Sequence, residues 1–101
     1  MTQSDAHVRF EMEIDAVQAG RLEELLERLG VERWLVLPGQ SGRTPEGRWN
    51  RTGQIAPSGR RVLVVMTLER GLADRISPEL HDTLDHLHGD IIAWPVAARQ
   101  G

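Results

Sequence analysis

The sequence of 101 residues contains no cysteine and no long apolar run. Without cysteine the chain cannot form a disulfide, a thiolate metal site or an iron–sulfur centre. No stretch approaches the roughly 18 apolar residues of a membrane-spanning helix, and residues 1–7 lack the basic and apolar regions of a signal peptide. We therefore expect a cytoplasmic protein that is not inserted into a membrane. A chain of this length has room for one modest core, so residues 1–101 are expected to form a single domain.

Lysine is absent as well, and all twelve basic residues are arginines. Five of them lie in residues 38–61 against one acid, Glu46, which gives this segment a formal charge of +4. The seven arginines and fourteen acids outside it give −7, and the net charge is −3. A negative chain argues against nucleic acid as the main partner, because duplex binding needs basic residues that neutralise phosphates. A codon bias would explain why lysine is absent, but it would not explain why five of the arginines cluster in residues 38–61. Because guanidinium forks suit phosphate and carboxylate, the segment is predicted to bind an anion.

Hydrophobic periodicity predicts most of the secondary structure. Alternate positions of residues 8–14 are apolar, which indicates a strand with one buried face. Leucines at helical spacing predict a helix over residues 16–29, capped by Asp15 and ended by a left-handed Gly30. Further strands are predicted at residues 31–37, 61–68 and 91–96, and the segment 61–68 is apolar on both faces, as a central strand requires.

A second helix is predicted to begin at Ser77 and Pro78, which suit the N-cap and the first helical position, and to end at Gly89. Whether residues 72–76 form an earlier helical turn stays open, because Pro78 would kink a helix that passes through it. The resulting order is β-α-β-β-α-β. It predicts an α+β, ferredoxin-like fold with a four-stranded antiparallel sheet and two helices on one face.

Two helices cover only one face of such a sheet. The second apolar face of the central strand, together with Trp34 or Trp94, is then left exposed to solvent. We expect a second copy of the chain to bury it through self-association.

Residues 38–60 contain five glycines and three prolines and have no periodicity. A connection of this length between two strands is expected to be a long flexible loop with a function. Successive amides at its start could form a concave nest around an anion, with a guanidinium beside it. This candidate anion site consists of Gly39, Gln40, Ser41, Gly42 and Arg43.

The arrangement resembles the PII signal-transduction family over nearly the whole chain. Residues 39–43 correspond, with one extra residue, to the Gly-x-Gly-Arg element that opens the long loop of that family. Arg60 and Arg61 stand where basic residues close the loop, and residues 89–96 are similar to the family's Gly-Lys-Ile-Phe-Val-x-Pro-Val segment.

This resemblance implies a non-enzymatic homotrimer that binds an adenine nucleotide between neighbouring subunits. The phosphates would be held by the base of the loop and by the turn before the last strand. The nucleotide or anion site would then include Arg60, Arg61 and Gly89 in addition to the five residues at the start of the loop. The loop would contact a regulated protein through Arg48, Trp49 and Arg51, although Trp49 is equally suited to packing the loop down.

Three departures from the family pattern narrow the expected ligand. Asp90 stands where relatives have a phosphate-binding lysine, and the turn before it is shortened to His88 and Gly89. The chain has no tyrosine for nitrogen-dependent modification. The short, lysine-free form is most similar to PII-like proteins associated with carboxysomes and bicarbonate uptake. The implied ligands are AMP or ADP and bicarbonate, with no covalent cofactor. The implied partner is a bicarbonate transporter or a carboxysome component, with association with carboxysomes as a further expectation.

The residues leave two other functions to consider. His81, Asp85 and His88 fall near one face of the second helix, as in a metal site or in a copper-tolerance relative that forms a trimer. A solvent-exposed edge of the helix explains these residues better. An acylphosphatase-like hydrolase needs an asparagine that holds water. Asn50 is the only asparagine, and its expected place in a loop rather than on a strand suits catalysis poorly.

Overall fold

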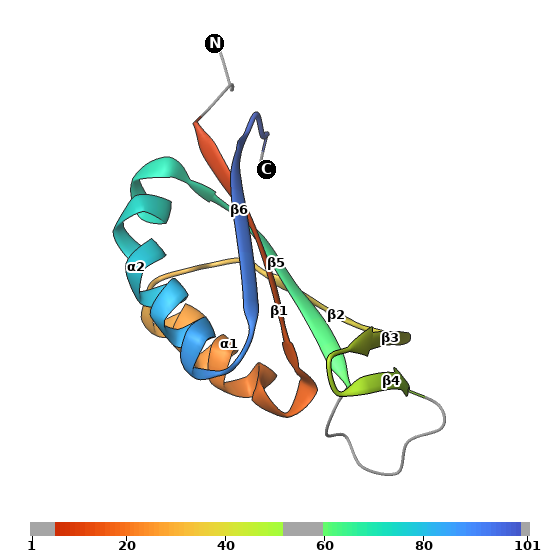
Figure 1. The fold of residues 1–101 in the computed structure, drawn as a ribbon. Coiled ribbons are helices and arrows are strands. Elements are labelled where there is room, and N and C mark those ends of the chain that lie inside the picture. The colour runs from red at the N-terminus through yellow and green to blue at the C-terminus, as the bar shows by residue number, and fades with distance from the viewer. Residues whose placement is uncertain (1–5, 52–59, 100–101) are drawn as a thin grey trace.

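The computed structural model describes residues 6–51 and 60–99. Four strands form one antiparallel sheet in the order β2-β5-β1-β6. They are β1 (His7–Asp15), β2 (Leu35–Pro38), β5 (Arg61–Glu69) and β6 (Asp90–Val96). The helices α1 (Ala19–Arg28) and α2 (Arg70–His86) cover the same face of the sheet (Figure 1). The predicted ferredoxin-like architecture and the central position of β5 are confirmed.

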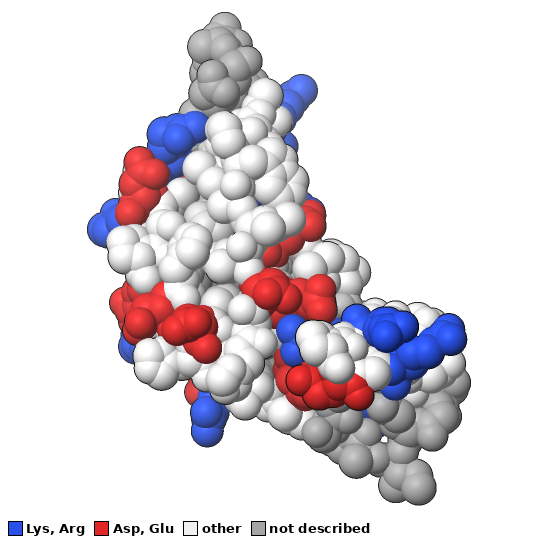
Figure 2. Space-filling model, viewed as in Figure 1, with Lys and Arg blue, Asp and Glu red and all other residues white. Residues whose placement is uncertain are grey.

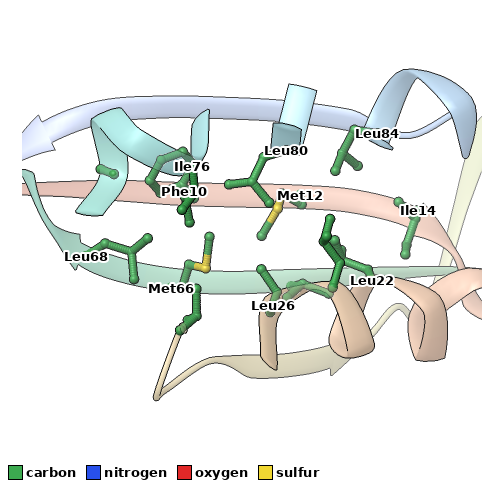
Figure 3. Close-up of a cluster of buried hydrophobic side chains, with 14 of the residues drawn as sticks. Phe10, Met12, Ile14, Leu22, Leu26, Met66, Leu68, Ile76, Leu80 and Leu84 are labelled. Atoms are coloured by element: carbon green, nitrogen blue, oxygen red, sulfur yellow. The ribbon is translucent and has the colours of Figure 1, made fainter. Parts of the chain in front are cut away.

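The core lies between this face of the sheet and the two helices. In Figure 3 the side chains of Phe10, Met12 and Ile14 point from β1 toward the leucines of the helices. All three are at most 1% exposed, as are Leu22 and Leu84. Because each side chain of this size stabilises the fold by roughly 1.5–3 kcal/mol when fully buried, the alternation in residues 8–14 is sufficient to orient β1.

The first helical segment departs from the predicted continuous helix over residues 16–29. Asp15 caps it as predicted, since its Oδ1 accepts a hydrogen bond from the amide of Val17 at 3.1 Å. The first turn, however, is the 3-10 helix η1 (Ala16–Gln18), and α1 follows it. Gly30 has a φ of 88° and ends the helix in the left-handed conformation, as predicted.

The strand predicted at residues 31–37 begins only at Leu35. Val31 is buried in the core at 4% exposure, and the indole Nε1 of Trp34 donates a hydrogen bond to Glu23 of α1 at 2.8 Å. These contacts hold residues 31–34 against the helix layer. Pairing with β5 therefore starts where the chain leaves that layer.

The second helix begins seven residues before Ser77, so the predicted start is wrong. Glu69 is the N-cap, and its Oε1 accepts the amide hydrogen of Gly71 at 3.1 Å. Pro78 lies inside the helix. Ala73 and Ile76 are buried on the face that packs against the sheet, and their burial offsets the hydrogen bond that proline removes.

The end of α2 is also different from the prediction. His88, with a φ of 55°, is the left-handed residue that follows the helix, and Gly89 is not. The amide of Gly89 donates to the carbonyl of Leu84 at 2.7 Å, which closes the turn in the manner of a Schellman motif.

Part of the predicted irregular loop forms a two-stranded hairpin. Its strands are β3 (Ser41–Thr44) and β4 (Gly47–Asn50), and Gly47 adopts a φ of 126° at the turn. The hydroxyl of Thr44 accepts the amide hydrogen of Glu46 at 3.2 Å and supports this turn. Residues 41–50 of the predicted long flexible loop are therefore a hairpin, and residues 52–59 lie outside the described part of the chain.

The face of the sheet opposite the helices is open and carries exposed apolar side chains on both edge strands, with Arg9, Glu11 and Glu13 of β1 between them. Leu35 and Leu37 on β2 are 57% and 43% exposed, and Ile92 and Trp94 on β6 are 59% and 40% exposed. The predicted uncovered face is therefore present. Among the described residues, no helix is long and apolar enough to cross a membrane.

Candidate functional site

A cleft of about 860 Å³ lies where the β3–β4 hairpin meets the end of β1 and the turn between α2 and β6. Figure 2 shows arginine side chains gathered over the hairpin end of the molecule, with carboxylates beside them. The cleft is lined by Glu13, Asp15, Val17, Gln18, Arg43, Thr44, Pro45, Glu46, Arg61, Leu87, His88 and Asp90. It therefore joins the predicted base of the loop to the predicted turn before the last strand.

Two guanidinium groups line this cleft, and they differ in whether their N–H donors are free to bind a ligand. Arg61 is committed to Glu13, because its Nε lies 3.1 Å from Glu13 Oε2 and its second nitrogen donates to the Glu13 carbonyl at 3.2 Å. The Arg61 side chain is 17% exposed. Arg43 is exposed and forms no ion pair with any described residue. Arg43 is thus the guanidinium with donors free for an incoming anion.

Four carboxylates line the same cleft: Glu13, Asp15, Glu46 and Asp90. Glu13 and Asp90 lie directly opposite each other on β1 and β6, and the repulsion between two like charges in such a pair is destabilising. With a neutral histidine, the groups facing the cleft sum to a formal charge of −2. Such a cleft favours an anion of low charge over a polyanion.

A second hollow, of about 420 Å³, adjoins the cleft and shares Glu13, Arg43 and Arg61 with it. Trp49 lines this hollow together with Gly39 and Gly42. A Cβ on Gly39 would lie 2.6 Å from the indole ring, and one on Gly42 would lie 3.0 Å from the indole nitrogen. Both glycines therefore make room for the tryptophan ring, which packs the hairpin down.

The predicted nest of amides at the start of the loop is not formed. The amide of Gly39 donates to the carbonyl of Arg61 at 2.9 Å, and Ser41 already belongs to β3. Gly30 and Gly47 are the only glycines with positive φ among the described residues, so neither Gly39 nor Gly42 supplies the left-handed residue of a nest. The carbonyl of Gln40 accepts from the amide of Arg51 at 3.0 Å, which extends the hairpin.

Several predicted site residues lie outside both hollows. Arg60 has its Nε buried without a hydrogen-bond partner among the described residues, and its carbonyl accepts the amide hydrogen of Ala16 at 2.8 Å. Gly89 packs against β1 instead of lining the cleft. Arg48 is exposed on β4, directly opposite Arg43 in the hairpin, and Arg51 is exposed just after it.

The alternative sites are not assembled by the fold. His81 directs its Nδ1 to the carbonyl of Ser77 at 2.9 Å, and His88 lies beyond the end of α2 instead of on its face with Asp85. Within the described residues, no three His, Asp or Glu side chains are placed to hold a metal ion. Asn50 lies on β4 and not in an irregular loop, but it lines neither hollow.

Sequence reasoning identified Asp90 but missed the other three carboxylates that line the cleft. The sequence identifies Asp15 only as a helix cap, and Glu46 only as the single acid of its segment. No spacing in the sequence relates these residues to Asp90, because the pairing of β1 with β6 brings them together.

The fold and the cleft can be compared with those of known proteins. No protein-family model and no curated protein sequence matches the chain. Among solved structures, CPII, a nitrogen regulatory PII-like protein from Thiomonas intermedia K12 bound to ADP, AMP and bicarbonate, superposes with a TM-score of 0.76 at 12% identity, over 93% of this chain and 89% of that one. Its apo form superposes with a TM-score of 0.66 at 10% identity, over 94% of both chains.

The chain has the PII-like fold. A candidate PII-like signaling protein from Thermus thermophilus agrees with this assignment, with a TM-score of 0.65 at 20% identity over 87% of this chain and 82% of that one. The resemblance inferred from the sequence is confirmed at the level of the fold. In this PII-like fold the cleft lies at the base of the segment that joins β2 to β5.

Proposed function

We propose that this protein is a non-enzymatic PII-like regulator that binds AMP or ADP in the cleft of about 860 Å³. The observation that carries the proposal is that Arg43 and Arg61 both line that cleft, in a fold that the chain shares with CPII. The first of the CPII structures compared above is bound to ADP, AMP and bicarbonate. Bicarbonate is proposed as a second ligand, because a small planar anion of single charge suits an arginine fork beside several carboxylates.

A homotrimer is part of this proposal. The open face of the sheet exposes large apolar side chains on both edge strands, namely Leu35, Leu37, Ile92 and Trp94, and a neighbouring subunit would cover them. Association through this face would place a neighbouring subunit beside the cleft. The nucleotide would then be bound between subunits.

The proposed signalling segment is residues 38–61. Arg48, Trp49 and Arg51 are its candidates for contact with a regulated protein. Trp49 already packs on Gly39 and Gly42, which favours a role in holding the hairpin, whereas Arg48 and Arg51 are exposed. The partner we propose is a bicarbonate transporter or a carboxysome component in the cytoplasm.

Calorimetric titration with AMP, ADP and ATP tests the proposal. We expect AMP or ADP to bind more tightly than ATP, since Asp90 repels each added phosphate and near contact costs about 1 kcal/mol or more. Arg43→Ala should weaken binding by roughly 1.5–3 kcal/mol, the size of a charge-assisted hydrogen bond. Arg75→Ala, at an exposed position of α2 away from the cleft, is the matched control and should bind normally. Absence of nucleotide binding by the wild-type protein would refute the proposal.

Bicarbonate is tested by repeating the ADP titration with and without it at constant pH and ionic strength. We expect tighter ADP binding with bicarbonate, because the first ligand to order the segment leaves less ordering for the second. Weaker binding would indicate one shared anion position, and an unchanged affinity would remove bicarbonate from the proposal.

Asp90→Lys should raise the affinity for ATP if Asp90 sets the phosphate selectivity.

A further inference from the structure

We infer that His88 is a phosphate-binding residue of the cleft and that it acts in its protonated form, an inference that rests on the proposed nucleotide site. His88 lines the cleft beside Asp90 and Leu87. It is also the only described residue other than glycine with a positive φ, at 55°. Glycine or asparagine is the usual residue in this conformation, so a histidine there costs the fold some stability.

The other two histidines near the end of α2 are engaged by their own helix. The Nδ1 of His81 lies 2.9 Å from the carbonyl oxygen of Ser77, and the Nδ1 of His86 lies 2.9 Å from that of Asp82. The ring of His88 is exposed and forms no hydrogen bond or ion pair within residues 6–51 and 60–99. Of the three rings, His88 alone both faces the cleft and has its nitrogens free for a ligand.

The net negative charge of the cleft explains why a protonated His88, added to Arg43 and Arg61, would favour the binding of an anion. The ionisable groups that line the cleft together with His88 are Glu13 and Asp15 from β1, Arg43 and Glu46 from the hairpin, Arg61 from β5 and Asp90 from β6. Protonation of His88 changes their formal sum from −2 to −1 and adds an N–H donor for a phosphate oxygen. Carboxylates and guanidiniums ordinarily keep their charge between about pH 6 and 8, whereas histidine does not. His88 would therefore couple nucleotide affinity to pH over this range.

The test compares ADP binding by the wild-type protein, His88→Asn and His81→Asn at about pH 6 and about pH 8, at fixed ionic strength. Asparagine tolerates the left-handed conformation and carries no charge, so His88→Asn should preserve the turn. The phosphate of ADP titrates in the same range, and the ratio of wild-type to variant affinity at each pH removes that contribution. We expect His88→Asn to weaken ADP binding about tenfold at the lower pH and less than about twofold at the higher pH. His81→Asn should match the wild type at both.

Three other outcomes would overturn the inference. If the wild-type protein binds ADP and His88→Asn binds it equally well at both pH values, His88 is not a ligand, while the nucleotide site stands. An equal loss at both pH values, repeated with His88→Gly, would assign His88 a role that does not involve protonation. If the wild-type protein binds no ADP at either pH, the nucleotide site itself is absent and the inference fails with it.

Discussion

Gly89 is a glycine because neighbouring atoms fill the space that a Cβ would need. That Cβ would contact Ile14 Cγ2, and it would lie 2.6 Å from Leu84 Cδ1 and 2.9 Å from the Glu13 carbonyl oxygen. The close approach lets the turn after α2 lie directly on β1. Packing therefore accounts for Gly89 without any contact to a ligand.

Gly89→Ala is expected to destabilise the protein by about 1–3 kcal/mol, as overpacking of a filled site does. Gly20→Ala is the matched control, because a Cβ at Gly20 on α1 meets nothing within 4 Å. This control should raise the stability by up to about 1 kcal/mol, since alanine favours the helix. Urea unfolding of both variants measures the difference. A Gly89→Ala protein as stable as the wild type would show that β1 and the turn can separate freely.

The pKa of His86 is raised above its ordinary value of 6.5, first by the hydrogen bond from its Nδ1 to the Asp82 carbonyl and then by the Asp82 carboxylate. Because the pKa is higher in the folded state, protonation of His86 stabilises the fold. This contribution is fully present below about pH 6.5 and is lost as the pH rises through the folded-state pKa.

His86→Gln should therefore flatten the decline in unfolding free energy as the pH rises above about 6.5. Denaturant unfolding at several pH values measures this slope. Asp82→Asn should flatten it in part, because it removes the carboxylate but keeps the backbone carbonyl. The assignment would fail if the slope of His86→Gln equalled that of the wild type.

At the scale of elements, the β3–β4 hairpin depends on one side chain. A two-stranded hairpin is marginally stable alone in water. Trp49 supplies the missing contact, because its ring packs on Gly39 and Gly42 beside Leu37 and Val62. The backbone bond from Gly39 to Arg61 ties the same segment to β5.

Trp49→Ala should increase amide hydrogen exchange of residues 41–50 by at least about tenfold, or about 1.4 kcal/mol of local stability. Exchange in β1 and β5 should stay unchanged, because their protection comes from the core. Arg48→Ala removes the neighbouring exposed side chain and should leave exchange in the hairpin as it is. Equal protection in Trp49→Ala and the wild type would mean that the backbone bonds alone hold the hairpin.

The second helix shows that burial can outweigh a local breaker. Pro78 within a helix interior costs about 3 kcal/mol relative to alanine. The helix nevertheless continues through it, because Ile76 before it and Leu80 after it are 3% and 0% exposed against the same face of the sheet. Glu69 then provides the N-cap that Ser77 was expected to supply.

At the scale of the whole molecule, the open sheet face is the surface through which the proposed trimer would associate. Its exposed apolar residues include Leu35, which is 57% exposed and lies next to Val65 in the register of β2 and β5. A carboxylate placed on this face would be buried and unpaired in a trimer, but solvated in a monomer.

Leu35→Asp should therefore convert a trimer into a monomer without unfolding the subunit. Sedimentation equilibrium at micromolar concentration measures the mass of both proteins. Arg75→Gln makes the same change in net charge at an exposed position of α2 and should leave the trimer intact. A wild-type monomer, or a trimer that persists in Leu35→Asp, would exclude association through this face.

The sequence by itself determined the strands at residues 8–14, 61–68 and 91–96, the first helix with its Asp15 cap and Gly30 end, and the layered arrangement of the whole. These features depend on short-range periodicity and on capping, which are read within one segment. The cluster of arginines in residues 38–61 and the resemblance to the PII family predicted that Arg43 and Arg61 belong to one site, and both line the cleft.

Only the tertiary structure decided where α2 begins, how residues 41–50 fold and which charges face one another. Ile76 favours the helix only because the sheet buries it, and Trp49 orders the hairpin only because Gly39 lies beneath it. The pairing of β1 with β6 brings Glu13 opposite Asp90, two residues far apart in the chain. Contacts between distant segments have no period in the sequence, and for that reason the acidic side of the cleft and the free ring of His88 became visible only in three dimensions.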